Sequence, residues 1–205
     1  IELHFTNCIS GTICIGYVGL IPLELPLPAQ TSFHSPDRFL ERTNQISADT
    51  LKLCMHEHYE DCPWREQGLY AYDSRNQCLY GYYLWGNYDF AESSLDLIGK
   101  NHKDGRYLPL TSPGITRITI PVFTIVWITA LREQWLYSGK NNLFRKWQNL
   151  IDKFLDSALA EPDPEFNGLY SSGSQPNLWN FCEWNGVMAS MQENGQTPYN
   201  IYLYE

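Results

Sequence analysis

Two neighbouring segments of the chain differ in how their apolar residues are distributed around a helix. Between Thr119 and Gly139 the apolar side chains lie nearly all round: Val122, Phe123, Ile125, Val126, Ile128, Leu131, Trp135 and Leu136. This distribution predicts a buried helix. From about Asn142 to Ala160 they form one stripe (Phe144, Trp147, Ile151, Phe154, Leu155 and Ala158), which predicts an amphipathic outer helix. A buried helix joined by a glycine turn to an outer one is typical of an all-α fold with an inner and an outer ring.

Further helix signals precede this pair. Ser35, Pro36 and Asp37 predict a helix start, with the hydroxyl as its cap and the proline at its first position. A central helix is expected from about Pro63 to Trp85, with Gly86 and Asn87 as its stop, and a shorter one over roughly 89–98, ending at Gly99. A long irregular loop follows, and loops of this length are often functional.

Residues 1–34 read differently from the rest. Residues 1–18 alternate loosely enough to form short strands, and Pro22, Pro26 and Pro28 then block both helix and central strand. We therefore predict that residues 1–34 are a linker or the tail of a preceding β element, and that a separate unit begins at residue 35.

Three carboxylates lie close together around Pro63. If Pro63 is the first helical residue, Asp61 lies on the loop before the helix and Glu66 in its first turn. Asp73 then follows two turns later on nearly the same face. Tyr70 and Gln77 are expected on that face too, and seven aromatic residues, Trp64, Tyr70, Tyr72, Tyr80, Tyr82, Tyr83 and Trp85, are expected around the acids. The pattern favours a surface that binds a hydroxyl-rich ligand over a merely solvated acidic helix start, which acids also favour for dipole reasons.

Composition excludes some classes of protein. The formal net charge of −9 makes nucleic-acid backbone a poor partner. No apolar run is long enough to span a bilayer, so no membrane association is expected. The sequence does not determine the compartment or the oligomeric state, although it slightly favours an intracellular bacterial location. The six cysteines have no framework spacing and are expected to be mostly reduced, buried thiols.

Residues near the acids could in principle support two other kinds of chemistry, metal binding and nucleophilic attack by a thiol. His56 and His58 offer two imidazoles two residues apart, but no second ligand cluster supports a metal, so no metal or cofactor is expected. Cys62 lies beside Asp61 without an indicated base, which favours a buried thiol over a nucleophile.

The acidic motif resembles the signature of the alpha-L-rhamnosidase family of glycoside hydrolases. In that family an Asp-Cys-Pro-x-Arg segment carries a Glu five residues after the first Asp and a second Asp twelve residues after it. Asp61, Arg65, Glu66 and Asp73 keep both spacings. The resemblance runs from about Ser35 to the end of the chain and implies that residues 35–205 are a partial glycosidase catalytic domain. It implies an (α/α)6 barrel, of which about the first half is expected here, and hydrolysis of terminal alpha-L-rhamnose from an oligosaccharide or glycoside with inversion.

The resemblance also implies roles for individual residues. Glu66 resembles the general acid, and Asp61, Asp73 and Arg65 resemble the groups that hold the sugar. The segment from Trp179 to Trp184 resembles one where the family often has an Asp-Trp pair, so Glu183 and Trp184 are expected at the sugar, although Glu183 replaces the aspartate. Trp64 is expected beside the acids.

An inverting reaction needs a protonated carboxyl at the leaving oxygen and a carboxylate that activates water on the other side. The family's general base is a Glu beyond residue 205, so these residues alone are expected to be nearly inactive. Two alternatives stay open: another sugar specificity on the same barrel, and a non-catalytic carbohydrate-binding fragment.

Overall fold

A computed structural model describes residues 2–6, 11–103, 105–160, 162–164, 168–181, 184 and 197–204. These residues contain the helices α1 (Arg38–Lys52), α2 (Ala71–Trp85), α3 (Asp89–Lys100), α4 (Pro121–Ser138), α5 (Asn142–Leu159) and α6 (Thr197–Tyr204). Within those ranges β pairing is limited to isolated bridges. The predicted all-α class is confirmed.

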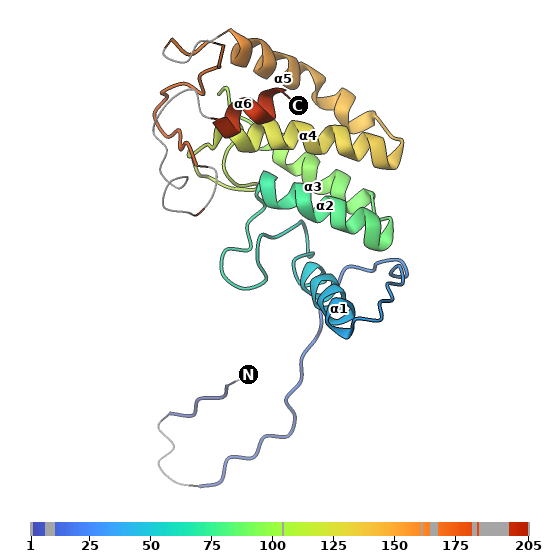
Figure 1. Cartoon of the computed structure of the whole chain (residues 1–205). Helices are drawn as coiled ribbons and strands as arrows, with labels where there is room; N and C mark the ends of the chain where they lie inside the picture. Colours follow the sequence, from blue (N-terminus) through green and yellow to red (C-terminus); the bar gives the residue numbers. More distant parts are fainter. Residues whose placement is uncertain are drawn as a thin grey trace.

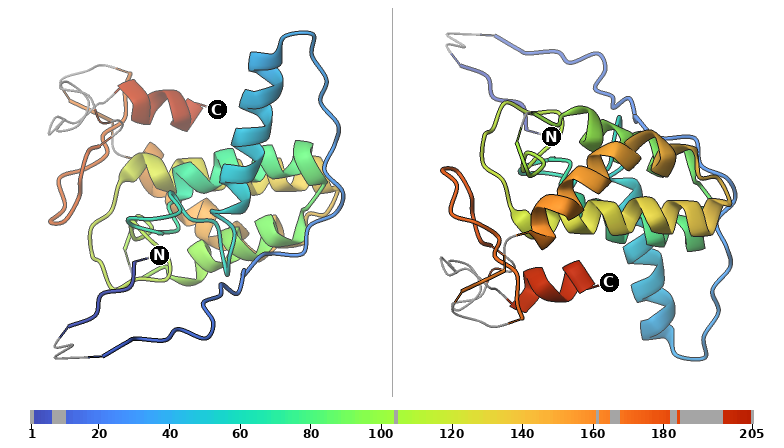
Figure 2. Two further views of the ribbon diagram at one scale, coloured as in Figure 1. Left: turned by 90° about the horizontal axis from the view of Figure 1, so that it is seen from below. Right: turned by 90° about the horizontal axis from the view of Figure 1, so that it is seen from above.

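The helices form two layers (Figure 1). α2 and α4 pack extensively on each other, and α6 packs on α4. α3 and α5 cover this layer and return in the opposite direction, as the colour gradient along each helix shows. α1 runs crosswise to the other helices (Figure 2). Because α2 and α4 run the same way, the loops before them gather at one end of the molecule.

Burial separates the two helices of the α4–α5 pair as predicted. Ten of the 18 residues of α4 are buried, against four of the 18 in α5. Trp127 of α4 is fully enclosed, and its Nε1 donates a hydrogen bond to the Leu95 carbonyl of α3 over 2.9 Å. The prediction that the apolar residues of α4 are buried fails near the end of the helix, where Leu136 is exposed.

Several helix ends follow their sequence signals. Gly86 and Gly139 end α2 and α4 in the left-handed conformation, with φ of 60° and 72°, and Pro121 begins α4. The start of α1 was predicted slightly too early. Its cap is Asp37 rather than Ser35, because Asp37 Oδ1 accepts a 2.8 Å hydrogen bond from the Phe39 N–H.

The start of the central helix was predicted wrongly. α2 begins at Ala71, and Pro63 lies in a loop. Asp61 and Gly68 close this loop with two hydrogen bonds: the Asp61 N–H donates to the Gly68 carbonyl (3.0 Å), and the Gly68 N–H donates to Asp61 Oδ1 (2.8 Å). Gln67 has φ of 52°, which a right-handed helix does not accommodate. We call residues 61–68 the acid loop.

The N-terminal segment is extended, and the short strands expected in residues 1–18 are not found in its described part. Thr31 joins this segment to the end of α2. Its N–H donates to the Leu84 carbonyl (2.8 Å), and its hydroxyl donates to the Tyr83 carbonyl (3.1 Å). These bonds satisfy carbonyls that a helix end leaves unpaired. The domain boundary between residues 34 and 35 stays a prediction.

Candidate functional site

A pocket of about 300 Å³ lies at the end of the molecule where α2 and α4 begin. Its lining combines residues of the acid loop, the starts of both helices and the segment after α5: Asp61, Arg65, Glu66, Tyr70, Asp73, Leu110, Ile120, Phe123, Trp179, Phe181 and Trp184. The lining therefore combines three carboxylates with a group of aromatic rings, of which we call Trp179, Phe181 and Trp184 the aromatic wall.

Glu60, a buried residue, directly precedes the acid loop and anchors its base through hydrogen bonds. Glu60 Oε1 lies 2.8 Å from His56 Nδ1, and the Glu60 carbonyl accepts a 2.6 Å hydrogen bond from Gln77 Nε2. Gln77 therefore binds the base of the loop and does not line the pocket, contrary to the expected helical face. His56 has a structural partner here, and the part of the chain that the structure describes contains no group of three or more potential metal ligands.

Both oxygens of Glu66 have a protein partner. Arg65 Nη2 lies 2.5 Å from Oε1, and the Tyr70 hydroxyl donates a 2.7 Å hydrogen bond to Oε2. The Glu66 side chain is 35% exposed, so it is reachable from the pocket. Burial first, and then the hydrogen bond and negative charge of Glu66, raise the pKa of Tyr70 above its ordinary value.

Asp61 and Asp73 reach the pocket by different routes. Asp61 stands at the closure of the acid loop, and Asp73 lies in the first turn of α2. A carboxylate in that turn is favoured by the helix dipole. The spacing of Asp61, Glu66 and Asp73 in the sequence therefore does bring the three side chains to one pocket, although not through one continuous helix.

The aromatic wall comes from a distant part of the chain. Thr119 and Leu178 form a parallel bridge, in which the Thr119 N–H donates to the Asn177 carbonyl (3.0 Å) and the Trp179 N–H donates to the Thr119 carbonyl (2.9 Å). This bridge ties Trp179 to the start of α4. The ring centroids of Trp179, Phe181 and Trp184 then lie 4.6 to 5.7 Å apart, as a cluster.

Most of the predicted site residues line the pocket. Asp61, Arg65, Glu66, Asp73 and Trp184 are all in its lining. Trp64 is 90% exposed and is not in the lining. Glu183 lies outside the described residues.

The aromatic residues expected around the acids are spread over α2 and its surroundings. Of the seven, only Tyr70 lines the pocket. Tyr82 and Trp85 are buried near the far end of α2, in the hydrophobic core. Tyr80 and Tyr83 are exposed on α2, so most of the seven aromatic residues do not surround the carboxylates.

Leu110, Ile120 and Phe123 were missed as pocket residues. The signal was available for two of them, because inner helices that run the same way place their first turns at the same end. Ile120 and Phe123 belong to the start of α4, next to the start of α2. Leu110 lies in an irregular loop and has no such signal.

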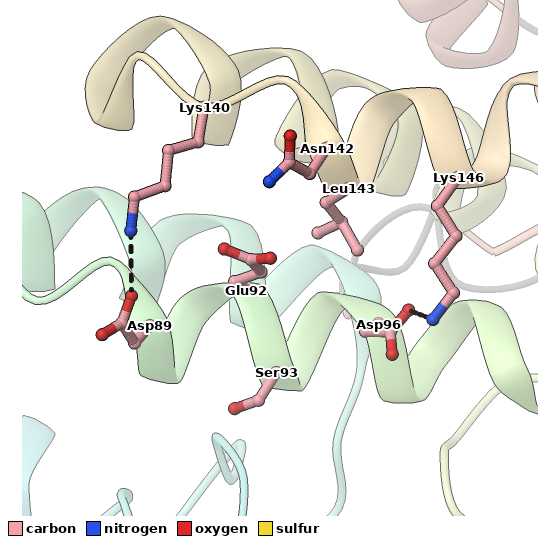
Figure 3. Close-up of a pocket in the computed structure, with 8 residues that line it drawn as sticks. All are labelled: Asp89, Glu92, Ser93, Asp96, Lys140, Asn142, Leu143 and Lys146. Carbon is pink, nitrogen blue, oxygen red and sulfur yellow. Dashed lines mark hydrogen bonds and ion pairs between the residues drawn. The ribbon is translucent and has the colours of Figure 1, made fainter.

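A larger groove on the outer face has a different character. About 580 Å³ in volume, it runs between α3 and α5 and is lined mostly by charged side chains (Figure 3). Asp96 pairs there with Lys146 (2.6 Å) and Asp89 with Lys140 (3.4 Å). These paired charges are the ordinary surface of two outer helices.

Comparisons with known proteins agree with this architecture. Residues 28–205 match the family model of the bacterial alpha-L-rhamnosidase six-hairpin glycosidase domain. The chain is similar to the crystal structure of a GH78-family rhamnosidase from Bacillus sp. GL1, with 29% identity and a TM-score of 0.77, over 87% of this chain and 18% of that one. It is also similar in fold to a rhamnosidase from Klebsiella oxytoca with rhamnose bound, with 18% identity and a TM-score of 0.64, over 75% of this chain and 30% of that one. A comparison with curated proteins found no significant match.

The chain thus spans less than a third of either solved structure. The resemblance seen in the acidic motif and the predicted six-hairpin fold are both confirmed. No helix in the described ranges is long and apolar enough to cross a membrane. The chain belongs to the bacterial alpha-L-rhamnosidase family, in its six-hairpin glycosidase domain.

Proposed function

We propose that this chain carries the acid side of the active site of an enzyme that removes terminal alpha-L-rhamnose with inversion at the anomeric carbon. The observation that carries the proposal is the pocket whose lining combines Glu66, Asp61 and Asp73 with the aromatic wall. The rhamnose bound in the similar Klebsiella oxytoca structure supports the choice of sugar.

Glu66 is the proposed general acid. It is reachable from the pocket, and its two oxygens are oriented by Arg65 and Tyr70. In this role it donates a proton to the glycosidic oxygen as the bond to the anomeric carbon breaks. Asp61 and Asp73 would accept hydrogen bonds from sugar hydroxyls.

The aromatic residues have proposed roles in binding. Trp184, exposed at the pocket, would stack against the sugar, and Glu183 would bind a hydroxyl beside it. Trp64 extends from the acid loop into solvent and would contact the part of the substrate outside the pocket. Rings of this kind offer a large apolar face to the C–H side of a sugar.

The general base is proposed to come from a later part of the domain. Inversion requires a carboxylate roughly 6.5–9.5 Å from the acid, with the attacking water between them. This chain covers only 18% and 30% of the two solved relatives, so such a residue can lie in the part of the domain that it does not cover.

Substitution of Glu66 by Gln in the complete protein tests the assignment. We expect a loss of about 10²–10⁴-fold in kcat/KM on a natural rhamnoside, whose leaving group needs a proton. The loss should be smaller on an activated aryl rhamnoside, because that leaving group departs without one. Equal losses on both substrates would instead make Glu66 a sugar-binding residue.

The sugar itself is tested by the unsubstituted protein on a panel of nitrophenyl glycosides. Turnover of the alpha-L-rhamnoside above all others is the expected result. Preference for another glycoside would support a different specificity on the same barrel, and binding without turnover would support a carbohydrate-binding role.

A further inference from the structure

The two oxygens of Glu66 differ in the proton chemistry of their partners. Arg65 contacts Oε1 with a guanidinium, which only donates hydrogen bonds and keeps its protons. Tyr70 contacts Oε2 with a hydroxyl, which both donates and accepts. A proton on Oε1 would point at the N–H groups of the Arg65 guanidinium, which are themselves donors. The proton that Glu66 transfers therefore belongs on Oε2, beside Tyr70.

Tyr70 is held firmly in that place by its neighbours. It caps α2 in an extended conformation (φ −100°, ψ 139°), between the buried residues Leu69 and Ala71. Its ring meets the Phe123 ring of α4 edge-on, with 6.5 Å between centroids. A Cβ at Gly68 would lie 2.7 Å from the Tyr70 ring, so the ring uses the space that the glycine leaves.

The bond from Tyr70 to Glu66 changes strength as the acid reacts. A hydrogen bond to a carboxylate is stronger than one to a neutral carboxyl group. The bond therefore strengthens while the proton leaves Oε2, which stabilises the transition state more than the bound substrate.

We propose that Tyr70 is a positioning residue, whose hydroxyl orients the Glu66 carboxyl so that Oε2 carries the transferred proton and stabilises the carboxylate that forms. The inference rests on the proposed function, in which Glu66 is the general acid. It makes Tyr70 act through Glu66 and assigns it no contact with the substrate.

The surroundings of Tyr70 keep its hydroxyl protonated. Burial and the neighbouring carboxylates Glu66, Asp61 and Asp73 all raise its pKa. Tyr70 therefore stays a neutral donor throughout the pH range in which a carboxylic acid works.

The test compares Tyr70→Phe with a matched control, Tyr72→Phe, in the complete protein. Both changes remove one phenolic hydroxyl near the start of α2, and both rings contact Phe123. The Tyr72 hydroxyl bonds to the Tyr202 hydroxyl over 2.8 Å and does not reach Glu66. The measurements are kcat and KM on a natural and an activated aryl rhamnoside, and the pH dependence of kcat.

We expect three changes in Tyr70→Phe that are absent from Tyr72→Phe. The alkaline limb of the pH profile should move up by about one unit, because the Tyr70 hydroxyl no longer stabilises the ionised form of the acid with a charge-assisted hydrogen bond. kcat should fall roughly 10-fold on the natural substrate, with KM nearly unchanged. The fall in kcat should be smaller on the activated substrate.

An unchanged pH profile in Tyr70→Phe, beside a Glu66→Gln variant that loses activity as described above, would overturn the inference and leave the proposed function intact. The same displacement in Tyr72→Phe would also overturn it, because the effect would then come from packing around Phe123. If Glu66→Gln lowers kcat/KM equally on both substrates, the proposed function fails, and the inference fails with it.

Discussion

At the scale of single residues, Gly68 joins two of the pocket's acids. Its N–H donates to Asp61 Oδ1, and its lack of a side chain admits the Tyr70 ring that contacts Glu66. A methyl group there would meet ring atoms at 2.7 Å, closer than real Cβ atoms come. The requirement is for space and is independent of any special backbone conformation.

Gly68→Ala should therefore displace Tyr70 and lower activity more than stability. A shift of about 1 Å at a catalytic group can cost about 10²-fold in rate, so we expect a loss of roughly 10–10² in kcat on natural rhamnosides. The free energy of unfolding should change by less than about 1.5 kcal/mol, because the Tyr70 ring is only partly buried and can rotate away. Steady-state kinetics and chemical denaturation of the complete protein measure the two effects. Gly16→Ala, where a Cβ meets nothing within 4 Å, is the control and should leave both unchanged.

The residues of the site were more predictable than the backbone that carries them. The spacing of Asp61, Glu66 and Asp73 sufficed to name three pocket carboxylates, since both spacings belong to a family motif. The acid loop was misread as helix, because Pro63 gives a strong local signal while the closing bonds of Asp61 join residues seven apart. Gly68, inside the predicted helix, was the available sign of a break.

At the scale of helices, Asp96 links the two outer helices. Its carboxylate, in α3, accepts hydrogen bonds from Lys100 (2.8 Å) in the same helix and from Lys146 (2.6 Å) and Trp147 Nε1 (3.0 Å) in α5. Burial alone would raise the pKa of Asp96, but these three donors outweigh it and hold the pKa below its ordinary value. The charged form is therefore the one that stabilises the fold.

Asp96→Asn should weaken the packing of α5 on α3. We expect the free energy of unfolding at pH 7 to fall by about 1 kcal/mol, a modest figure because both lysines are partly solvated. Because the folded-state pKa lies below the unfolded one, this contribution is complete above the unfolded pKa of about 3.9 and is lost as the pH falls through the folded value. Denaturation curves between pH 7 and pH 2 should show the variant and the parent converging at the acid end. Lys140→Gln is the control, because it breaks the exposed pair with Asp89 at 3.4 Å without removing a carboxylate from the first turn of α3, and it should change stability by almost nothing. A constant difference across the pH range would show that the charge of Asp96 is not the source of the effect.

Helix identity followed from periodicity, whereas the meaning of some glycines did not. Gly139 was correctly predicted to end a helix. Gly99 was read as another stop, yet it lies inside α3, and a Cβ there would lie 2.5 Å from the Trp147 ring and 2.9 Å from the Trp127 ring. The glycine lets three helices approach one another. One sequence cannot distinguish a stop from a close contact, because the contact involves residues far along the chain.

At the scale of the whole molecule, the described helices leave several large apolar side chains in solvent. They lie on α1, α2, α4, α5 and α6, and include Phe39, Ile46, Tyr80, Tyr83, Leu136, Leu159, Ile201 and Tyr204. Large apolar patches on the surface of a soluble protein often mark faces that contact another protein surface. This chain covers only 18% and 30% of the two solved relatives. We therefore predict that a later part of a complete six-hairpin domain covers such faces. The ring could be predicted from the alternation of buried and one-sided helices, but the pattern of burial in α4 does not say which faces await a partner.

Residues 1–205 produced alone should therefore behave differently from the complete protein. We expect the isolated segment to bind an apolar fluorescent dye and to self-associate, because Tyr83, Leu136 and their neighbours stay in water. It should hydrolyse natural rhamnosides at a rate near background, since the carboxylate that we propose to activate water, opposite the proposed acid Glu66, belongs to a later part of the domain. Dye fluorescence, sedimentation velocity and turnover of a natural rhamnoside measure the three properties side by side. Co-expression of the remaining domain as a separate chain is the decisive comparison, because it should lower dye binding and restore turnover together. Full turnover by residues 1–205 alone would mean that the base lies within this chain, and the proposed division of the acid and base between two parts of the domain would be wrong.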